Sequence, residues 1–86
     1  MPIIARFFGI IIRMFYDDHY PPHFHAEYQG MKAVFDFKGN IIKGDFSSRT
    51  AVKLVREWID FHVDELEMDW KLAIEGKEIK QIEPLK

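Results

Sequence analysis

Three histidines fall within one short stretch of the chain, at His19, His23 and His25. Acidic side chains stand beside them, at Asp17, Asp18 and Glu27. Imidazole exchanges protons near neutral pH, with an ordinary pKa of about 6.5, and in its neutral form it binds divalent metals. If the protein transfers protons or binds a metal, these residues are therefore the first candidates.

Three roles remain open for these histidines. A metal site would use the ligand set His19, His23, His25 and Glu27, and it would hold a divalent ion such as zinc. A catalytic site would use His23 and His25 to move protons while Arg13 holds a phosphate. In a purely structural role, the imidazoles would hydrogen-bond to Glu27, Asp36 and backbone groups on a partly wet sheet face.

A β-hairpin is predicted to carry two of the histidines. Residues 23–28 and 31–37 each alternate apolar with polar side chains, and the Gln29-Gly30 pair between them suits a two-residue turn. Such a turn pairs Tyr28 with Met31, and the pairing continues residue by residue along both strands.

The two faces of this hairpin differ in character. One face is the predicted core and collects Phe24, Ala26, Tyr28, Met31, Ala33, Phe35 and Phe37. The other face faces solvent and collects His23, His25, Glu27, Lys32, Val34 and Asp36. Side chains two residues apart on a strand point the same way at a spacing of ~7 Å, so the candidate ligands share a face.

The rest of the chain predicts an α+β fold. A strand over residues 10–16 and a fourth strand over 41–46 extend the hairpin to an antiparallel β-meander of three to four strands, preceded by an extended piece over residues 3–8. In this arrangement Lys43 lies opposite Asp36. Residues 78–83 alternate weakly and predict a further edge strand.

One C-terminal helix is predicted over residues 49–75, either long and continuous or broken near 65–69. Ser47 or Ser48 caps its start and Gly76 ends it. The predicted buried stripe is Val52, Val55, Ile59, Val63, Leu66, Trp70 and Ile74. The length of 86 residues predicts a single domain spanning 1–86.

Composition narrows the class of protein. The chain has no cysteine, which excludes disulfides and thiolate metal clusters and fits a cytoplasmic location. Its 12 Lys and Arg against 14 Asp and Glu give a net charge of −2, so nucleic-acid binding is disfavoured. The apolar run over residues 7–12 is shorter than the ~20 residues of a membrane span, and no cleavage site follows it. No membrane partner is expected.

Several segments together resemble a known family. They are Met1-Pro2, Arg6-Phe7-Phe8-Gly9-Ile10, Tyr16-Asp17-Asp18-His19, Pro21-Pro22-His23-Phe24-His25-Ala26 and Val55-Arg56-Glu57-Trp58. They resemble the small bacterial domain-of-unknown-function family 4160, and the Pro-Pro-His-Phe-His-Ala segment is the most specific part. The resemblance brings no established activity. Members are often encoded beside another small protein, which implies a two-gene module of toxin–antitoxin or regulatory type.

Two functions follow as hypotheses. The first is a protein-interaction module whose partner is a small bacterial protein encoded nearby, bound through the histidine-bearing sheet face or the exposed part of the helix. The alternative is a metal-binding domain or a small ribonuclease-like enzyme, in which His23 or His25 moves protons and a cation holds a phosphate. Arg6, Arg13 and Lys43 are the candidate cations. A concave site around the histidines favours the alternative.

Overall fold

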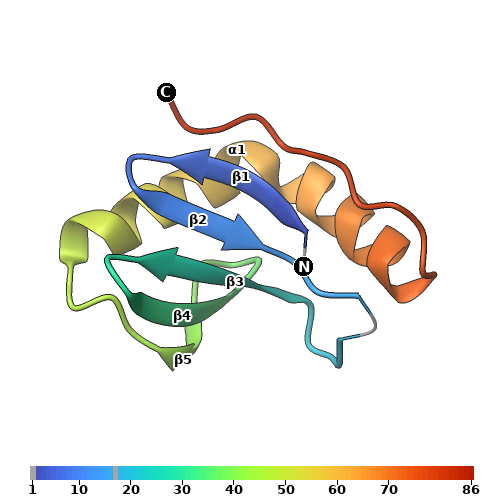
Figure 1. The fold of residues 1–86 in the computed structure, drawn as a ribbon, viewed down its shortest axis with the longest axis horizontal. Helices are drawn as coiled ribbons and strands as arrows, with labels where there is room; N and C mark the ends of the chain where they lie inside the picture. The colour runs from blue at the N-terminus through green and yellow to red at the C-terminus, as the bar shows by residue number, and fades with distance from the viewer. Residues whose placement is uncertain (1, 17) are drawn as a thin grey trace.

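The computed structural model describes residues 2–16 and 18–86 as an antiparallel sheet packed on one helix (Figure 1). Met1 and Asp17 lie outside the described residues. Met1 belongs to one segment of the family resemblance, and Asp17 is an acidic neighbour of the histidines. The elements are β1 (Ile3–Phe7), β2 (Ile10–Arg13), β3 (His23–Tyr28), β4 (Met31–Asp36), β5 (Ile41–Gly44) and α1 (Arg49–Ile74).

The sheet is a simple meander in the order β1-β2-β3-β4-β5. The predicted α+β meander is confirmed, but the count of three to four strands is too low. The extended piece near the N-terminus pairs with β2 as a full strand, and the predicted 10–16 strand ends at Arg13. No helix among the described residues has the length and apolar character needed to cross a membrane.

The register of the β3–β4 hairpin is confirmed at every pair, from Tyr28 opposite Met31 to His23 opposite Asp36. The turn between the strands has positive φ at both positions, 49° at Gln29 and 78° at Gly30. This is the backbone of the two-residue turns that match the twist of paired strands. The hairpin therefore presents His23 and His25 on the face predicted from the sequence, but His23 is buried there and does not face solvent.

The predicted register of β5 is wrong. Lys43 lies opposite Val34 rather than Asp36, because the β4–β5 ladder is irregular between Val34 and Phe35. Asp36 instead holds the following turn, where its Oδ1 accepts hydrogen bonds from the backbone N–H groups of Lys38 and Asn40, both at 2.9 Å. Asp36 is therefore occupied with the turn rather than with His23.

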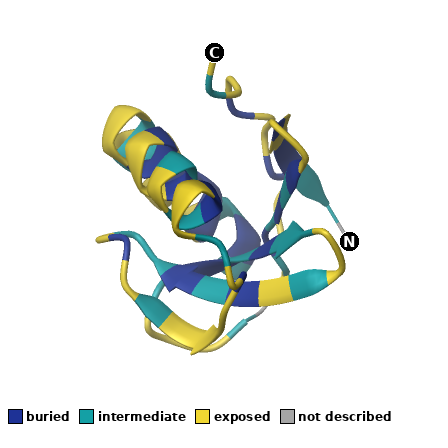
Figure 2. Ribbon diagram, turned by 90° about the vertical axis from the view of Figure 1, so that its left-hand side faces the viewer, coloured by how far each residue is buried: buried dark blue, intermediate teal, exposed yellow. Residues whose placement is uncertain are grey.

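The core lies between the sheet and α1, whose buried side faces the strands in Figure 2. Ser48 caps the helix, since its Oγ accepts the backbone N–H of Ala51 at 3.2 Å. Five residues of the predicted core face and helix stripe are at most 6% exposed and are confirmed as core: Phe24, Phe35, Val55, Ile59 and Trp70. The predicted stripe is only partly right, because Val52, Val63 and Ile74 are only partly buried.

The helix is interrupted at His62, whose φ of −131° and ψ of 22° are not helical. The predicted break near 65–69 is therefore placed too late. The Nδ1–H of His62 donates a hydrogen bond to the Glu65 carboxylate at 2.7 Å. The hydrogen bond of His62 is thus formed within α1.

The predicted edge strand over residues 78–83 does not form among the described residues. The C-terminal segment instead runs between β1 and α1 (Figure 1). The N–H of Ile82 donates to the Ile4 carbonyl at 2.8 Å, and the indole N–H of Trp58 donates to the Glu83 carbonyl at 2.8 Å. This segment covers the outer edge of β1.

Candidate functional site

Asp18, His23 and His25 bring three potential metal-ligand atoms together. One carboxylate oxygen, Asp18 Oδ2, lies 2.9 Å from Nε2 of His23 and 3.3 Å from Nε2 of His25. All three ligand atoms lie within 4.8 Å of one another. Two imidazoles and one carboxylate thus converge on a single point.

Two different parts of the chain position these groups. His23 and His25 are alternate residues of β3, so the pleat turns both to the same face, with ring centroids 5.3 Å apart. Asp18 comes from the loop between β2 and β3 and reaches back over that face. The convergence therefore depends on the loop as well as on the strand.

A hydrogen bond fixes the orientation of the His23 ring. Its Nδ1 lies 2.7 Å from the carbonyl oxygen of Pro21. A carbonyl oxygen only accepts, so Nδ1 carries the proton and donates. In the neutral ring Nε2 then carries a lone pair, and that lone pair points at the carboxylate of Asp18. Two acceptors in this contact require a cation between them, either a second ring proton or a metal ion.

Aromatic side chains hold both imidazoles in place. The Phe15 ring meets the His25 ring edge-on, at a centroid distance of 4.3 Å and an angle of 86°. Trp70 of α1 packs on His23 with centroids 5.3 Å apart. The His23 side chain is 7% exposed and that of His25 is 34% exposed. The cluster is therefore fixed on its core side and open to solvent at His25.

The carboxyl of Asp18 is held in its charged form. Burial alone would raise its pKa, but the hydrogen bond from His25, the backbone N–H of His19 and the charge of His23 together lower that pKa below the ordinary 3.8. These groups all act on the same carboxylate. Asp18 is therefore an anion at neutral pH.

The other residues singled out from the sequence lie around this cluster. His19 has a side chain 92% exposed, and its Nδ1 lies 3.3 Å from the second oxygen of Asp18. Glu27 points to the same sheet face but forms an ion pair with Arg13, at 3.5 Å between Oε1 and Nε. The structure thus brings Asp18 to His23 and His25, and it pairs Glu27 with Arg13.

The sequence pattern places Asp18 beside the histidines but does not mark it as a ligand. Its signal was present, because Asp18 stands one residue before His19 and five before His23. The fold of the 18–22 loop decides that Asp18 rather than Glu27 meets the two rings, and strand periodicity does not describe that loop.

Two hollows meet at His25 on the outer face of the sheet. One, of about 210 Å³, is lined by Asp18, His19, His23 and His25 together with Pro21, Val34, Ile42 and Lys43. The other, of about 330 Å³, is lined in part by Arg13, Glu27 and Lys32 and shares His25, Val34 and Lys43 with the first. The histidine cluster therefore opens into concave surface on both sides.

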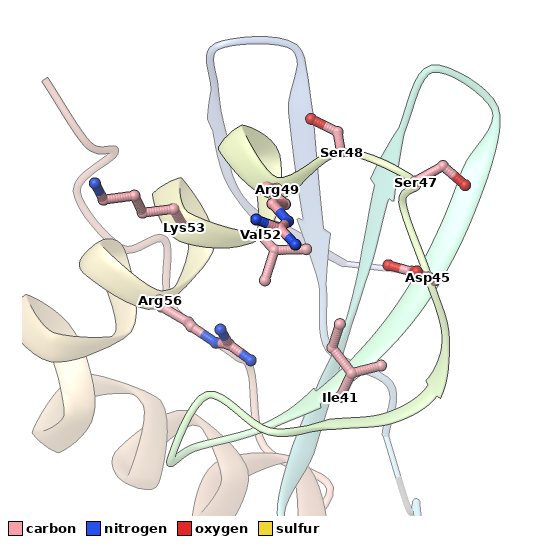
Figure 3. Close-up of a pocket in the computed structure, with 8 residues that line it drawn as sticks. All are labelled: Ile41, Asp45, Ser47, Ser48, Arg49, Val52, Lys53 and Arg56. Atoms are coloured by element: carbon pink, nitrogen blue, oxygen red, sulfur yellow. The ribbon is translucent and has the colours of Figure 1, made fainter.

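A roomier hollow of about 600 Å³ lies elsewhere, at the start of α1 (Figure 3). Its lining includes Arg49, Lys53 and Arg56 but no histidine. The Nε of Arg56 donates to the Gly39 carbonyl at 2.9 Å and so ties the β4–β5 turn to the helix.

Comparison with known proteins identifies one family. The family described as a domain of unknown function, DUF4160, matches residues 9–71. That span contains β2 to β5, most of α1 and the cluster of Asp18, His23 and His25. No curated protein and no solved structure matches the chain. Because the match covers well over half of the 86 residues, the chain belongs to the DUF4160 family.

Proposed function

We propose that this protein is a divalent-metal-binding domain in which Asp18, His23 and His25 hold the ion and zinc is the metal. The observation that carries the proposal is the contact of 2.9 Å between Nε2 of His23 and the Asp18 carboxylate, combined with the commitment of Nδ1 to the Pro21 carbonyl. A metal-ligating histidine usually donates its other ring N–H in this way, which orients the ring and raises its basicity.

The donor set fits zinc. Zinc takes imidazole nitrogen at about 2.0–2.1 Å and carboxylate oxygen at about 2.0–2.2 Å. Ligand atoms bound to one such ion lie roughly 3 Å apart, which is close to the two contacts of 2.9 and 3.3 Å made by Asp18 Oδ2. Three protein ligands leave at least one coordination position free, and the hollow of about 210 Å³ adjoins them.

A proton is the competing occupant. If His23 carries a second ring proton, Nε2–H donates to Asp18 and the pair needs no metal. The two occupants compete for the same lone pair, because a protonated Nε2 must lose its proton before it can bind a metal. Metal binding is also expected to release protons, since the ligands must be deprotonated.

The test is calorimetric titration of untagged, metal-stripped protein with zinc chloride at neutral pH. The expected result is one zinc per chain in the wild type and loss of that binding in Asp18→Asn, which keeps the shape of the side chain but removes its charge. His62→Ala is the matched control, because His62 is bound to Glu65 on α1 and should leave zinc binding unchanged. An equal affinity in Asp18→Asn and the wild type would overturn the proposal.

A separate titration of His19→Ala defines the ligand set. His19 is nearly fully exposed and approaches the second oxygen of Asp18 rather than the shared point. We expect a loss of affinity well below that of Asp18→Asn. Glu27→Gln should act likewise, because Glu27 is paired with Arg13.

A second candidate function is protein interaction within a two-gene module in the cytoplasm. What supports it is the exposed surface of α1, where Phe61 and Met68 are 70% and 54% exposed. Exposed acidic residues, Asp60, Asp64 and Glu67, stand beside them. Contiguous exposed apolar surface marks interaction sites, and the acidic surroundings favour a basic partner.

The partner to test is the small protein expected to be encoded next to this one. Co-expression and size-exclusion chromatography should give a complex that the Phe61→Ser/Met68→Ser double variant fails to form. The Asp18→Asn variant should still form it, because Asp18 lies on the sheet face and not on α1. Failure of the wild type to form any complex with that protein would contradict this second function.

A further inference from the structure

One row of side chains crosses four strands on the outer face of the sheet. Arg13 of β2 lies opposite His25 of β3, His25 opposite Val34 of β4, and Val34 opposite Lys43 of β5. Residues opposite one another in antiparallel strands project to the same face, with strands ~4.8 Å apart. His25 thus stands between two cations, Arg13 on one side and Lys43 on the other.

The hollow of about 330 Å³ lies along this row. Its charged lining consists of three cations and one carboxylate, namely Arg13, Lys32, Lys43 and Glu27, in addition to His25. The net charge of this lining is therefore positive, although the whole chain has a net charge of −2. A concave surface with excess positive charge attracts and concentrates anions.

Arg13 has hydrogen-bonding capacity left over. Its Nε is buried and has no hydrogen-bond partner among the described residues, and its contact with Glu27 at 3.5 Å is an ion pair only. A guanidinium offers five donors in a planar fork that matches the oxygens of phosphate. Lys32 and Lys43 are both exposed and add mobile ammonium donors at the rim.

We propose that this hollow binds the phosphate group of a phosphate ester of nucleotide size, held by Arg13, Lys32 and Lys43. The inference deepens the metal-binding function and rests on it in one respect, because His25 belongs to both sites. A phosphate in the hollow lies beside the proposed metal ligands, so the metal site and the anion site together favour phosphate esters as the substrate class. The volume suits a single nucleotide, at the lower end of the range of roughly 300–1,000 Å³ for small-ligand sites.

The test is NMR titration of the metal-free and the zinc-loaded protein with three probes: inorganic phosphate, adenosine monophosphate and a five-nucleotide single-stranded DNA. We expect shifts in the backbone amides of β2, β3 and β4 around the hollow, and tighter binding of the nucleotide than of phosphate. Tighter binding of the oligonucleotide than of the nucleotide identifies a strand as the source of the phosphate, and equal binding identifies the free nucleotide.

Variants separate this site from general surface charge. Arg13→Gln and Lys43→Met should each weaken binding about 10-fold, as expected for the loss of a charged hydrogen bond. Lys53→Met, in the hollow at the start of α1 (Figure 3), is the matched control and should have no effect. Lys43 is exposed, so Lys43→Met keeps the test valid if Arg13→Gln unfolds.

Failure of the phosphate site can be distinguished from failure of the zinc site. Asp18→Asn removes the proposed metal site but leaves the three cations, so the metal-free variant should still bind adenosine monophosphate. Absence of binding by all three probes to the wild type, or an equal loss in Lys53→Met and Lys43→Met, would overturn the phosphate site. Neither outcome bears on zinc binding by Asp18, His23 and His25.

Discussion

The Nδ1 atom of His23 lies 2.7 Å from the carbonyl oxygen of Pro21, two positions earlier in the chain. This contact sets the tautomer of the neutral ring and turns Nε2 toward Asp18, which lies on the other side of the ring. Trp70 packs on the same ring and ties it to α1. A site oriented in advance spends little free energy on ordering when its ligand binds.

The core under the site depends on Phe35, which stacks on Phe24 with ring centroids 5.6 Å apart and is fully buried. Phe35→Ala should lower the free energy of unfolding by about 3–5 kcal/mol. That is a large part of the roughly 4–13 kcal/mol expected for a chain of this length. Urea unfolding followed by tryptophan fluorescence measures the loss.

Phe61→Ala is the control for this substitution, because Phe61 is 70% exposed on α1. Its unfolding free energy should stay within about 0.5 kcal/mol of the wild type. Similar losses in the two variants would mean that the core is not the one described between the sheet and α1.

Two glycines with nearly the same backbone test the β4–β5 pairing. Gly30 and Gly44 have φ of 78° and 77°, but a Cβ at Gly30 meets nothing within 4 Å whereas a Cβ at Gly44 collides with the Lys32 carbonyl. Gly30→Ala should cost about 1–2 kcal/mol from the left-handed backbone alone. Gly44→Ala should cost clearly more, about 2–4 kcal/mol, since the clash adds to that strain.

The Gly44 variant also connects stability to the anion site, because Gly44 follows Lys43 and lines the same hollow. Chemical denaturation measures both costs, and the NMR titration with adenosine monophosphate reports whether Gly44→Ala weakens binding while Gly30→Ala leaves it unchanged. Equal costs for the two alanines would show that β5 does not approach Lys32 as closely as described.

Much of the hairpin could be predicted from the sequence because its information is local. Alternation over 23–28 and 31–37 together with Gln29-Gly30 leaves one register that buries the apolar face, and that register formed. The position of Lys43 could not be predicted in this way, since the ladder irregularity at Val34 and Phe35 shifts the pairing. Irregularities of this kind follow from packing and turn geometry beyond the strand itself.

The candidate site, too, could be predicted from the sequence only in part. The pleat of β3 places His23 and His25 side by side, and this depends only on strand periodicity. The contact of Asp18 with both rings depends on the path of a loop, and a loop shows no residue periodicity from which its path could be predicted. The helix break is likewise predicted only in part: it lies at His62 and not near 65–69, because apolar residues continue at helical spacing across it.

A buried carboxyl on α1 predicts a dependence of stability on pH. Asp69 is 2% exposed, its Oδ1 accepts the Lys80 N–H at 3.0 Å, and its Oδ2 has no partner among the described residues. Burial raises the pKa of Asp69 above 3.8, and the charge of Glu65 raises it further against the Lys80 hydrogen bond. The folded state therefore disfavours the charged form, so this group begins to cost stability as the pH rises through the ordinary value of 3.8 and costs the full amount above its raised pKa.

Asp69→Asn keeps the acceptor for Lys80 and removes the charge, so it should stabilise the protein at pH 7, on the order of 1 kcal/mol. The gain should shrink as the pH falls and vanish below the ordinary aspartate pKa of 3.8, where the wild-type carboxyl is protonated in both states. Thermal unfolding of both proteins across this pH range measures the gap. A gap that stays constant with pH would contradict the assignment.

The metal centre is tested most directly by zinc anomalous diffraction from crystals of the untagged protein grown with one equivalent of zinc. One strong peak is expected about 2.0–2.2 Å from a carboxylate oxygen of Asp18 and from Nε2 of both His23 and His25. Nδ1 of His23 should keep its contact with the Pro21 carbonyl. A peak held instead by His19, Glu27 or His62, or none among the three ligand atoms, would contradict the proposed metal centre.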